Sequence, residues 1–299
     1  MPYGQHDVRP ANLERRTLVR RANRASPRSV SQRARIVGVV LATEVLGSER
    51  ALPGPALALL HGFTQTRRSW GPVADGLAAT RTVVLVDAPG HGGSGDQRLN
   101  LWSAGREVVR TVGPADLVGY SMGARICLHA ALAAPGQVHR LVLVGATAGI
   151  ADPGARAVRQ ADDEALANSI ERGGNRALPE FFERWLAGPL FRDLSVEAAD
   201  LEARRANTAA GLSAALRLCG TGTQEPLDDR LGQLTMPVLL VAGERDGTFC
   251  AEAERLATGI PGASLAVVEG AGHACHLERP DAFLALVEAW LTRTQPAPA

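Results

Sequence analysis

The chain has 299 residues, of which 45% are hydrophobic, so it is long and apolar enough to bury the core of one large domain. Its formal net charge of +1 gives no global field of the kind that nucleic-acid-binding proteins need, and no apolar run approaches the ~20 residues of a membrane span. All of its basic residues are arginines, so one arginine alone is weak evidence for a binding site. Its cysteines lie far apart without a C-x-x-C pair, which predicts free thiols and a cytoplasmic protein: Cys127, Cys219, Cys250 and Cys275.

Residues 1–33 are rich in Arg, Ser and Pro and poor in large apolar residues, which predicts a disordered basic extension without the apolar segment of a secretory signal. Apolar runs of strand length then follow at residues 36–41, 56–60, 82–86, 116–120, 141–145, 237–243 and 265–269. Because these runs are apolar on both faces, they predict a parallel sheet covered by helices, an α/β fold. We expect the core in two parts, residues 34–146 and 231–294.

Between the two parts, residues 147–230 show helical spacing in the segments 165–170, 178–186 and 212–218 and no convincing strand. This interruption predicts a helical lid inserted into the α/β core. The second part of the core ends with a predicted helix at residues 281–292, and residues 295–299 (Q-P-A-P-A) read as a loose tail.

The segment G-Y-S-M-G at residues 119–123 follows a predicted strand and precedes a helical pattern. This is the setting of a nucleophile elbow, a sharp turn that lifts a serine hydroxyl above the sheet. A hydroxyl needs a base and an orienting carboxylate, which in this arrangement come later in the chain, in the order Asp then His. We therefore predict Ser121, Asp246 and His273 as a catalytic triad, with Glu244 and His276 as the competing carboxylate and imidazole.

A second turn, H-G-F at residues 61–63, follows the predicted strand at 56–60. Its backbone N–H at Phe63, together with that of Met122 after the serine, predicts an oxyanion hole. The glycine-rich loop at 87–94 lacks the G-x-G-x-x-G pattern leading into a helix, so we predict no nucleotide site there. The histidines lack metal-ligand spacing, and neither a metal nor another cofactor is predicted.

With these pieces in order, residues 37–292 resemble the α/β-hydrolase family. Several segments are closer to one group within it, the 2-succinyl-6-hydroxy-2,4-cyclohexadiene-1-carboxylate synthases of menaquinone biosynthesis: H-G-F-T, V-D-A-P-G-H-G, G-Y-S-M-G-A-R, T-A-G-I-A-D-P-G-A-R-A-V-R-Q, W-L-A-G-P-L-F, A-N-T-A-A-G-L and G-A-G-H-A-C-H-L-E-R-P. The resemblance implies an elimination in which Ser121 removes a proton from carbon and pyruvate leaves, with the N–H groups of Phe63 and Met122 on the enolate oxygen.

The substrate implied by this resemblance carries three carboxylates, so its pocket needs fixed cations. Carried over residue by residue, the resemblance implies that substrate binds to Tyr120, Arg125, Arg159, Trp185 and Arg204, with Arg205 as the alternative to Arg204. The expected partner is thus a small polycarboxylate, and the sequence leaves the oligomeric state open.

Two other functions fit the same residues. A serine esterase, lactonase or carbon–carbon bond hydrolase would use Ser121 as a nucleophile with the same Asp246 and His273. A binding protein on this scaffold would need no triad, and the presence of competent residues at all three positions disfavours it.

Overall fold

The computed structural model describes residues 41–47 and 54–294. The predicted extension at 1–33 and the tail at 295–299 lie outside these residues. So does most of the apolar run at 36–41, of which only Leu41 is described; Leu41 is buried and precedes the first strand, which begins at Thr43.

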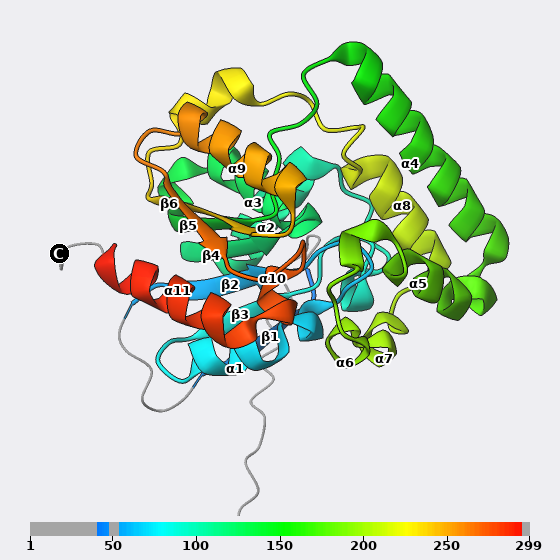
Figure 1. Cartoon of the computed structure of the whole chain (residues 1–299), viewed down its shortest axis with the longest axis horizontal. Coiled ribbons are helices and arrows are strands. Elements are labelled where there is room, and N and C mark those ends of the chain that lie inside the picture. Colours follow the sequence, from blue (N-terminus) through cyan, green and yellow to red (C-terminus); the bar gives the residue numbers. More distant parts are fainter. Residues whose placement is uncertain (1–40, 48–53, 295–299) are drawn as a thin grey trace, which may run out of the picture. The chain divides into compact units, whose positions relative to one another are not determined.

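In the described part of the chain, seven strands form one sheet in the order β1-β3-β2-β4-β5-β6-β7 (Figure 1). Their bounds are β1 Thr43–Leu46, β2 Ala56–Leu60, β3 Val83–Val86, β4 Ala115–Tyr120, β5 Val138–Val144, β6 Val238–Gly243 and β7 Ser264–Val268. Only the β1–β3 pairing is antiparallel, and the others are parallel. The strands β4 and β6 are buried along their whole length, as expected where both faces of a sheet are covered. The predicted α/β class is confirmed.

Helices cover both faces of this sheet (Figure 1). On one face lie α1 (Gly71–Ala78) and α11 (Pro280–Arg293), and on the other lie α2 (Leu101–Val112), α3 (Met122–Ala133) and α9 (Gly247–Gly259). Each face has its own apolar cluster, so the sheet is the middle of three layers. The short helix α10 (Cys275–Glu278) follows β7, and α11 extends the helix predicted at 281–292 by one residue at each end.

Residues 147–230, all of them described, contain helices and no strand. We call them the helical insertion; its α-helices are α4 Pro153–Gly173, α5 Leu178–Leu186, α6 Val196–Ala199, α7 Leu201–Arg204 and α8 Ala209–Cys219. Helices α4 and α8 pack side by side (Figure 1) and share an apolar cluster with α5. Connections throughout the fold contain the 3-10 helices Arg67–Trp70, Gly92–Ser94, Pro135–Gln137, Asn175–Ala177, Pro189–Phe191 and Asp228–Gln233.

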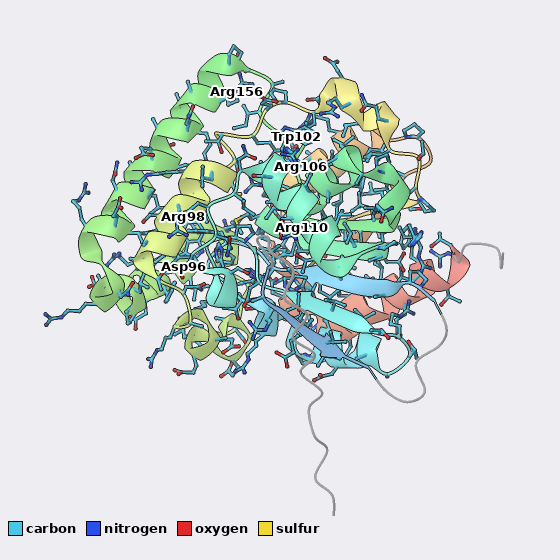
Figure 2. All side chains as sticks on the ribbon, turned by 180° about the vertical axis from the view of Figure 1, so that it is seen from behind. Asp96, Arg98, Trp102, Arg106, Arg110 and Arg156 are labelled. Atoms are coloured by element: carbon cyan, nitrogen blue, oxygen red, sulfur yellow. The ribbon has the colours of Figure 1, made fainter. Side chains whose placement is uncertain are left out.

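Many arginines lie on the outside of this fold. Figure 2, which shows the back of the molecule, labels Arg106 and Arg110 on α2 and Arg156 at the start of α4. Such residues are weak evidence for a site, because exposed guanidinium groups and their ion pairs are common on surfaces. The more informative set is small: among the described residues, the buried arginines are Arg125, Arg140 and Arg204.

Candidate active site

The elbow around Ser121 joins β4 to α3. Ser121 has a φ of 51° and a ψ of −110°, in a region that residues with a side chain rarely adopt, and its N–H donates to the carbonyl oxygen of Val144 at 2.8 Å. A Cβ atom on Gly123 would lie 2.3 Å from the carbonyl oxygen of Leu60, and one on Gly119 would lie 2.5 Å from that of Gly123. The glycines are therefore needed for backbone-to-backbone contact, and the turn exposes the serine hydroxyl to the cavity in front of it.

The three residues predicted as a triad meet at the carboxyl ends of their strands. Asp246 follows β6 and begins α9, and His273 lies in the loop after β7. The imidazole Nδ1 lies 2.7 Å from Asp246 Oδ2, and Nε2 lies 3.3 Å from Ser121 Oγ. With Nδ1–H donating to the carboxylate, Nε2 is left to accept the serine proton. The geometry is that of a serine activated by an oriented general base.

The competing residues lie elsewhere. Glu244 accepts a hydrogen bond from the backbone N–H of Gly270 at 2.8 Å, so its carboxylate holds the loop after β7. His276 is 1% exposed, with its ring centroid 4.3 Å from that of Tyr120 and 4.7 Å from that of Trp70. Burial lowers the pKa of His276 to about 3, which keeps this imidazole neutral as part of the packing behind the site.

Two backbone donors face the same space as the serine. Phe63 lies in the loop after β2, and Met122 is the first residue of α3. Among the described residues, no acceptor is found for the backbone N–H of either one. Both residues line a cavity together with Ser121 and His273. An anionic oxygen bound there would receive two N–H donors and the favourable end of the α3 dipole.

The cavity in front of Ser121 has a volume of about 460 Å³, within the usual range for small-molecule sites. It lies between the core and the helical insertion, which contributes residues from α4, α5 and α8. Its lining combines apolar side chains with the cations Arg125 and Arg159 and the carboxylates Asp162 and Asp163, of which Asp163 pairs with Arg159. The site can therefore hold an apolar ring that carries negative groups.

Arg125 lies one helical turn after Ser121 on α3 and is 7% exposed. Its Nη1 donates to the carbonyl oxygen of Cys219 at 2.7 Å, and no carboxylate among the described residues pairs with it. Burial lowers the pKa of Arg125 to about 10, so the group remains charged at neutral pH. A buried cation without a counter-ion is costly to a protein, and it marks a place where a ligand can supply the missing charge.

Arg159 reaches the cavity from α4. Its Nε donates to Asp163 Oδ1 at 2.8 Å, and Asp163 is held in turn by the backbone N–H of Gly222 at 3.0 Å. Because only Nε is engaged, the two terminal nitrogens can bind a carboxylate. Trp185, from α5, lies edge-on to Phe63 with ring centroids 5.4 Å apart and also lines the cavity.

Tyr120 and Arg204 lie behind this cavity. The Tyr120 ring centroid lies 5.3 Å from that of His273, and its hydroxyl is buried without a hydrogen-bond partner among the described residues. Arg204 is 1% exposed and donates through Nε to the carbonyl oxygen of Ala199 at 2.8 Å and through Nη1 to the hydroxyl of Thr64. Neither lines the cavity, so their positions give no support to direct substrate contact.

The alternative arginine, Arg205, points outward. It is 62% exposed at its side chain and pairs with Glu202 at 3.1 Å. Of the two neighbouring arginines, Arg204 is thus the one turned toward the core, a difference that follows from the helical rotation between adjacent residues and not from any local sequence signal.

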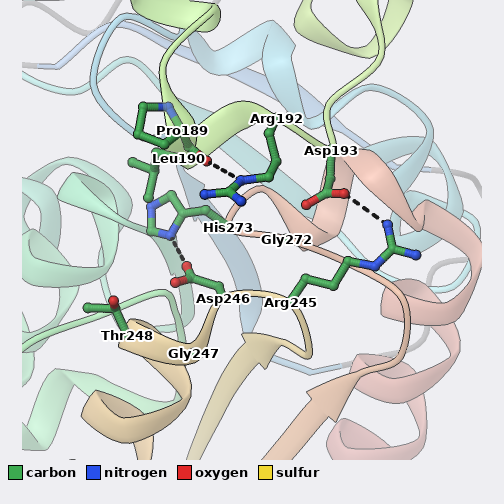
Figure 3. Close-up of a pocket in the computed structure, with 10 residues that line it drawn as sticks. All are labelled: Pro189, Leu190, Arg192, Asp193, Arg245, Asp246, Gly247, Thr248, Gly272 and His273. Atoms are coloured by element: carbon green, nitrogen blue, oxygen red, sulfur yellow. Dashed lines mark hydrogen bonds and ion pairs between the residues drawn. The ribbon is translucent and has the colours of Figure 1, made fainter.

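A second cavity of about 400 Å³ lies on the other side of His273 (Figure 3). It shares only His273 and Leu190 with the first cavity, so these side chains separate the two. An ion pair at 2.9 Å between Asp193 of the helical insertion and Arg245 of the core lies at this cavity. No local pattern predicts this cavity or its ion pair, because the two partners are 52 positions apart in the chain.

Within the described ranges, no set of three or more His, Cys, Asp or Glu side chains is placed to bind a metal ion. The same residues include no helix with the length and apolar character of a membrane span.

Comparison with known proteins agrees with this architecture. The profile of the Alpha/beta hydrolase family matches residues 57–286. A protein of Bacillus subtilis (strain 168), provisionally named 2-succinyl-6-hydroxy-2,4-cyclohexadiene-1-carboxylate synthase, is 34% identical over 79% of this chain and 90% of its own length. A protein of Klebsiella pneumoniae (strain ATCC 700721 / MGH 78578) with the same synthase name is 31% identical over 78% of this chain and 92% of its own.

Among solved structures, MenH from S. aureus superposes with a TM-score of 0.78 at 26% identity, covering 85% of this chain and 99% of that one. The family match at residues 57–286 spans Ser121, Asp246 and His273. The chain therefore belongs to the α/β hydrolase family and, within it, to the family of the 2-succinyl-6-hydroxy-2,4-cyclohexadiene-1-carboxylate synthases.

Proposed function

We propose that this protein is a lyase that eliminates pyruvate from 2-succinyl-5-enolpyruvyl-6-hydroxy-3-cyclohexene-1-carboxylate, giving 2-succinyl-6-hydroxy-2,4-cyclohexadiene-1-carboxylate in menaquinone biosynthesis. The observation that carries the proposal is Arg125, a buried cation that faces the serine cavity without a carboxylate partner among the described residues. A neutral ester would leave that charge uncompensated, whereas a tricarboxylate would pair with it. The names of the relatives support the same reaction.

In this reaction Ser121 is a base. His273 accepts the serine proton at Nε2, and Asp246 stabilises the imidazolium through Nδ1–H. The serine oxygen removes the proton next to the succinyl ketone, and the electrons of that carbon–hydrogen bond form an enolate. Its oxygen receives the N–H groups of Phe63 and Met122. When the enolate collapses, the ring gains a double bond, the carbon–oxygen bond to the enolpyruvyl group breaks, and the leaving enolate is protonated to pyruvate.

The remaining cavity residues orient the substrate. Arg125 and Arg159 both line the cavity, one from the core helix α3 and one from α4 of the helical insertion. Two forked cations at fixed positions can bind two carboxylates of one ring at once, which selects a rigid polyanion over a flexible one. Trp185 and Phe63 supply an aromatic wall for the apolar part of the ring.

The test is stoichiometric pyruvate release, followed as NADH oxidation with lactate dehydrogenase, from the enolpyruvyl substrate. We expect Ser121→Ala to abolish release and Arg125→Met to reduce it about 10-fold to 100-fold, from the loss of one charge-assisted hydrogen bond. The control is Arg156→Met, which removes a partly buried arginine of α4 that does not line the cavity.

Cleavage of p-nitrophenyl acetate is measured in parallel. Rapid ester cleavage by the unmodified protein without pyruvate release would replace the lyase by a serine esterase, lactonase or carbon–carbon bond hydrolase. Equal losses of both activities in Arg125→Met would also contradict the proposal, because Arg125 is expected to matter only for a charged substrate.

A further inference from the structure

The loop at residues 62–65 carries the Phe63 donor. The other backbone N–H groups of this loop donate hydrogen bonds within the protein. The N–H of Gly62 donates to Gln65 Oε1 at 2.9 Å, and the N–H of Gln65 donates to the Gly62 carbonyl oxygen at 3.2 Å. The N–H of Thr64 donates to Nε2 of His91 at 3.2 Å. In the described structure, the N–H of Phe63 is therefore the one backbone donor of this loop that remains available to a ligand.

Thr64 holds the loop in a strained conformation. Its φ is 68°, in the left-handed region, which is a genuine outlier for a β-branched residue. Such a conformation persists only where surrounding contacts impose it. The contacts on Thr64 thus hold the loop directly after the residue that carries the oxyanion donor.

Two of these contacts come from the helical insertion. Asn207 donates through Nδ2 to the Thr64 carbonyl oxygen at 2.8 Å and accepts the N–H of Gly92 at Oδ1 at 2.9 Å. Arg204 donates through Nη1 to the Thr64 hydroxyl. All three side chains are at least 96% buried, so water cannot replace a lost partner.

Near Asn207, the backbone of the helical insertion packs directly against the backbone of the core. Helix α8 begins two residues after Asn207, and a Cβ atom on Gly211 of that helix would lie 2.3 Å from the carbonyl oxygen of Gly90. Conversely, a Cβ atom on Gly90 would lie 2.5 Å from the carbonyl oxygen of Gly211. Since backbone touches backbone there, Asn207 projects from a fixed base toward the loop.

We propose that Asn207 and Arg204 are positioning residues that hold Thr64 in its strained conformation and thereby aim the Phe63 N–H at the oxyanion. They act through the loop, because neither side chain lines the cavity. The oxyanion hole of the core is thus completed by the helical insertion. The inference rests on the proposed function only for the use of an oxyanion hole, which an elimination and a serine hydrolysis share.

The experiment compares Asn207→Ala with the matched control Asn168→Ala, which removes an asparagine of α4 that bonds Arg217 away from the loop. Loss of an oxyanion donor costs about 100-fold to 1,000-fold in kcat, so a misdirected donor should cost about 10-fold to 100-fold. We expect Asn207→Ala to lower kcat for pyruvate release by that factor with KM changed by less than about 3-fold, as befits an interaction made only in the transition state. The control should leave both constants unchanged.

A second readout is independent of the natural substrate. The rate at which a fluorophosphonate labels Ser121 should fall by a similar factor in Asn207→Ala. The serine attacks the phosphorus atom, and the phosphoryl oxygen occupies the same oxyanion hole. If the wild-type protein is labelled but releases no pyruvate, the proposed lyase function is refuted. The positioning role of Asn207 is then tested by the labelling rates alone. A wild-type protein that does neither would overturn both proposals.

Thr64 gives a test that does not require Asn207 variants to fold. Thr64→Ser keeps the hydroxyl that accepts a hydrogen bond from Arg204, so Ser121 should be labelled near the wild-type rate. Thr64→Val keeps the β-branched shape but removes this hydroxyl, so the labelling rate should fall. Two results would contradict the positioning role: equal labelling in the two Thr64 variants, or an Asn207→Ala protein with raised KM and unchanged kcat.

Discussion

Replacing Arg125 by methionine should reduce pyruvate release and leave the protein at least as stable. Methionine has a similar length and adaptable packing, so it can fill the space of the side chain without the charge. Burial lowers the pKa of Arg125 to about 10, well below that of an exposed guanidinium. At about 1.4 kcal/mol per pKa unit, holding this cation in the folded state costs about 3 kcal/mol.

The variant also loses a contact. The hydrogen bond from Arg125 to the carbonyl oxygen of Cys219 is lost, and a buried acceptor without its partner costs about 1–3 kcal/mol. Removing the buried charge stabilises the protein, and losing the hydrogen bond destabilises it by a similar amount. We therefore expect the free energy of unfolding of Arg125→Met to stay unchanged or to rise by about 1–2 kcal/mol, as the difference of these values. Function would then be retained at the expense of stability, as in other binding sites.

The assay is urea unfolding at pH 7, with Arg140→Met as the matched control. Arg140 is also buried, at 4% exposed, but it pairs with Asp116 and donates to the carbonyl oxygen of Leu291. Removing one partner of a buried ion pair costs about 3–5 kcal/mol, because the other charge is left alone. Arg140→Met should therefore unfold at clearly lower urea than Arg125→Met.

Equal destabilisation of the two variants would contradict this expectation, because Arg125 would then be a structural residue. Full pyruvate release by Arg125→Met would contradict its role in substrate binding. Both results can be read only when the slopes of the unfolding transitions agree, because a changed slope reports a change in the unfolded or native state.

Three further predictions concern the elbow, pH and the cavity. Gly123→Ala should lower the free energy of unfolding by more than the ~1–3 kcal/mol of ordinary overpacking, because the new Cβ meets the backbone of Leu60. Thermal unfolding measures this loss of stability, and a loss below ~1 kcal/mol would contradict the prediction. His91 has its pKa lowered by burial to about 3, so between about pH 6.5 and 3 the unfolded chain binds more protons, and stability should fall by about 1.4 kcal/mol per pH unit on acidification. In urea unfolding at pH 7 and pH 5, His91→Gln should show a smaller loss than the wild type. Asp163→Asn frees Arg159 from its ion pair and should raise KM for the polycarboxylate several-fold with less effect on kcat; an unchanged KM would exclude this orienting role.

The elbow shows why part of the site could be predicted from sequence. A strand, a tight turn and a helix are local structures, and the glycines at 119 and 123 are required by backbone contacts within or next to the same turn. The chain order Ser, Asp, His belongs to the nucleophile-elbow arrangement, and the carboxyl ends of parallel strands share one edge of the sheet, so Asp246 and His273 could be predicted before any distance was known.

Other parts of the site depend on contacts that no local pattern contains. The arginines at 204 and 205 have the same residue type, yet one contacts Thr64 in the core and the other pairs with Glu202 at the surface. Asn207 gives no sequence signal for its contact with a residue 143 positions away.

The sequence by itself determined the α/β class and the helical interruption between two parts of the core, and it predicted the three residues that meet as Ser121, Asp246 and His273, because periodicity, turn glycines and motif order are properties of short segments. Only the tertiary structure decided which arginines face the cavity and how the helical insertion holds the oxyanion loop. Those features depend on the docking of distant helices against loops, and the rotation of one residue on a helix is enough to turn a side chain from solvent into the core.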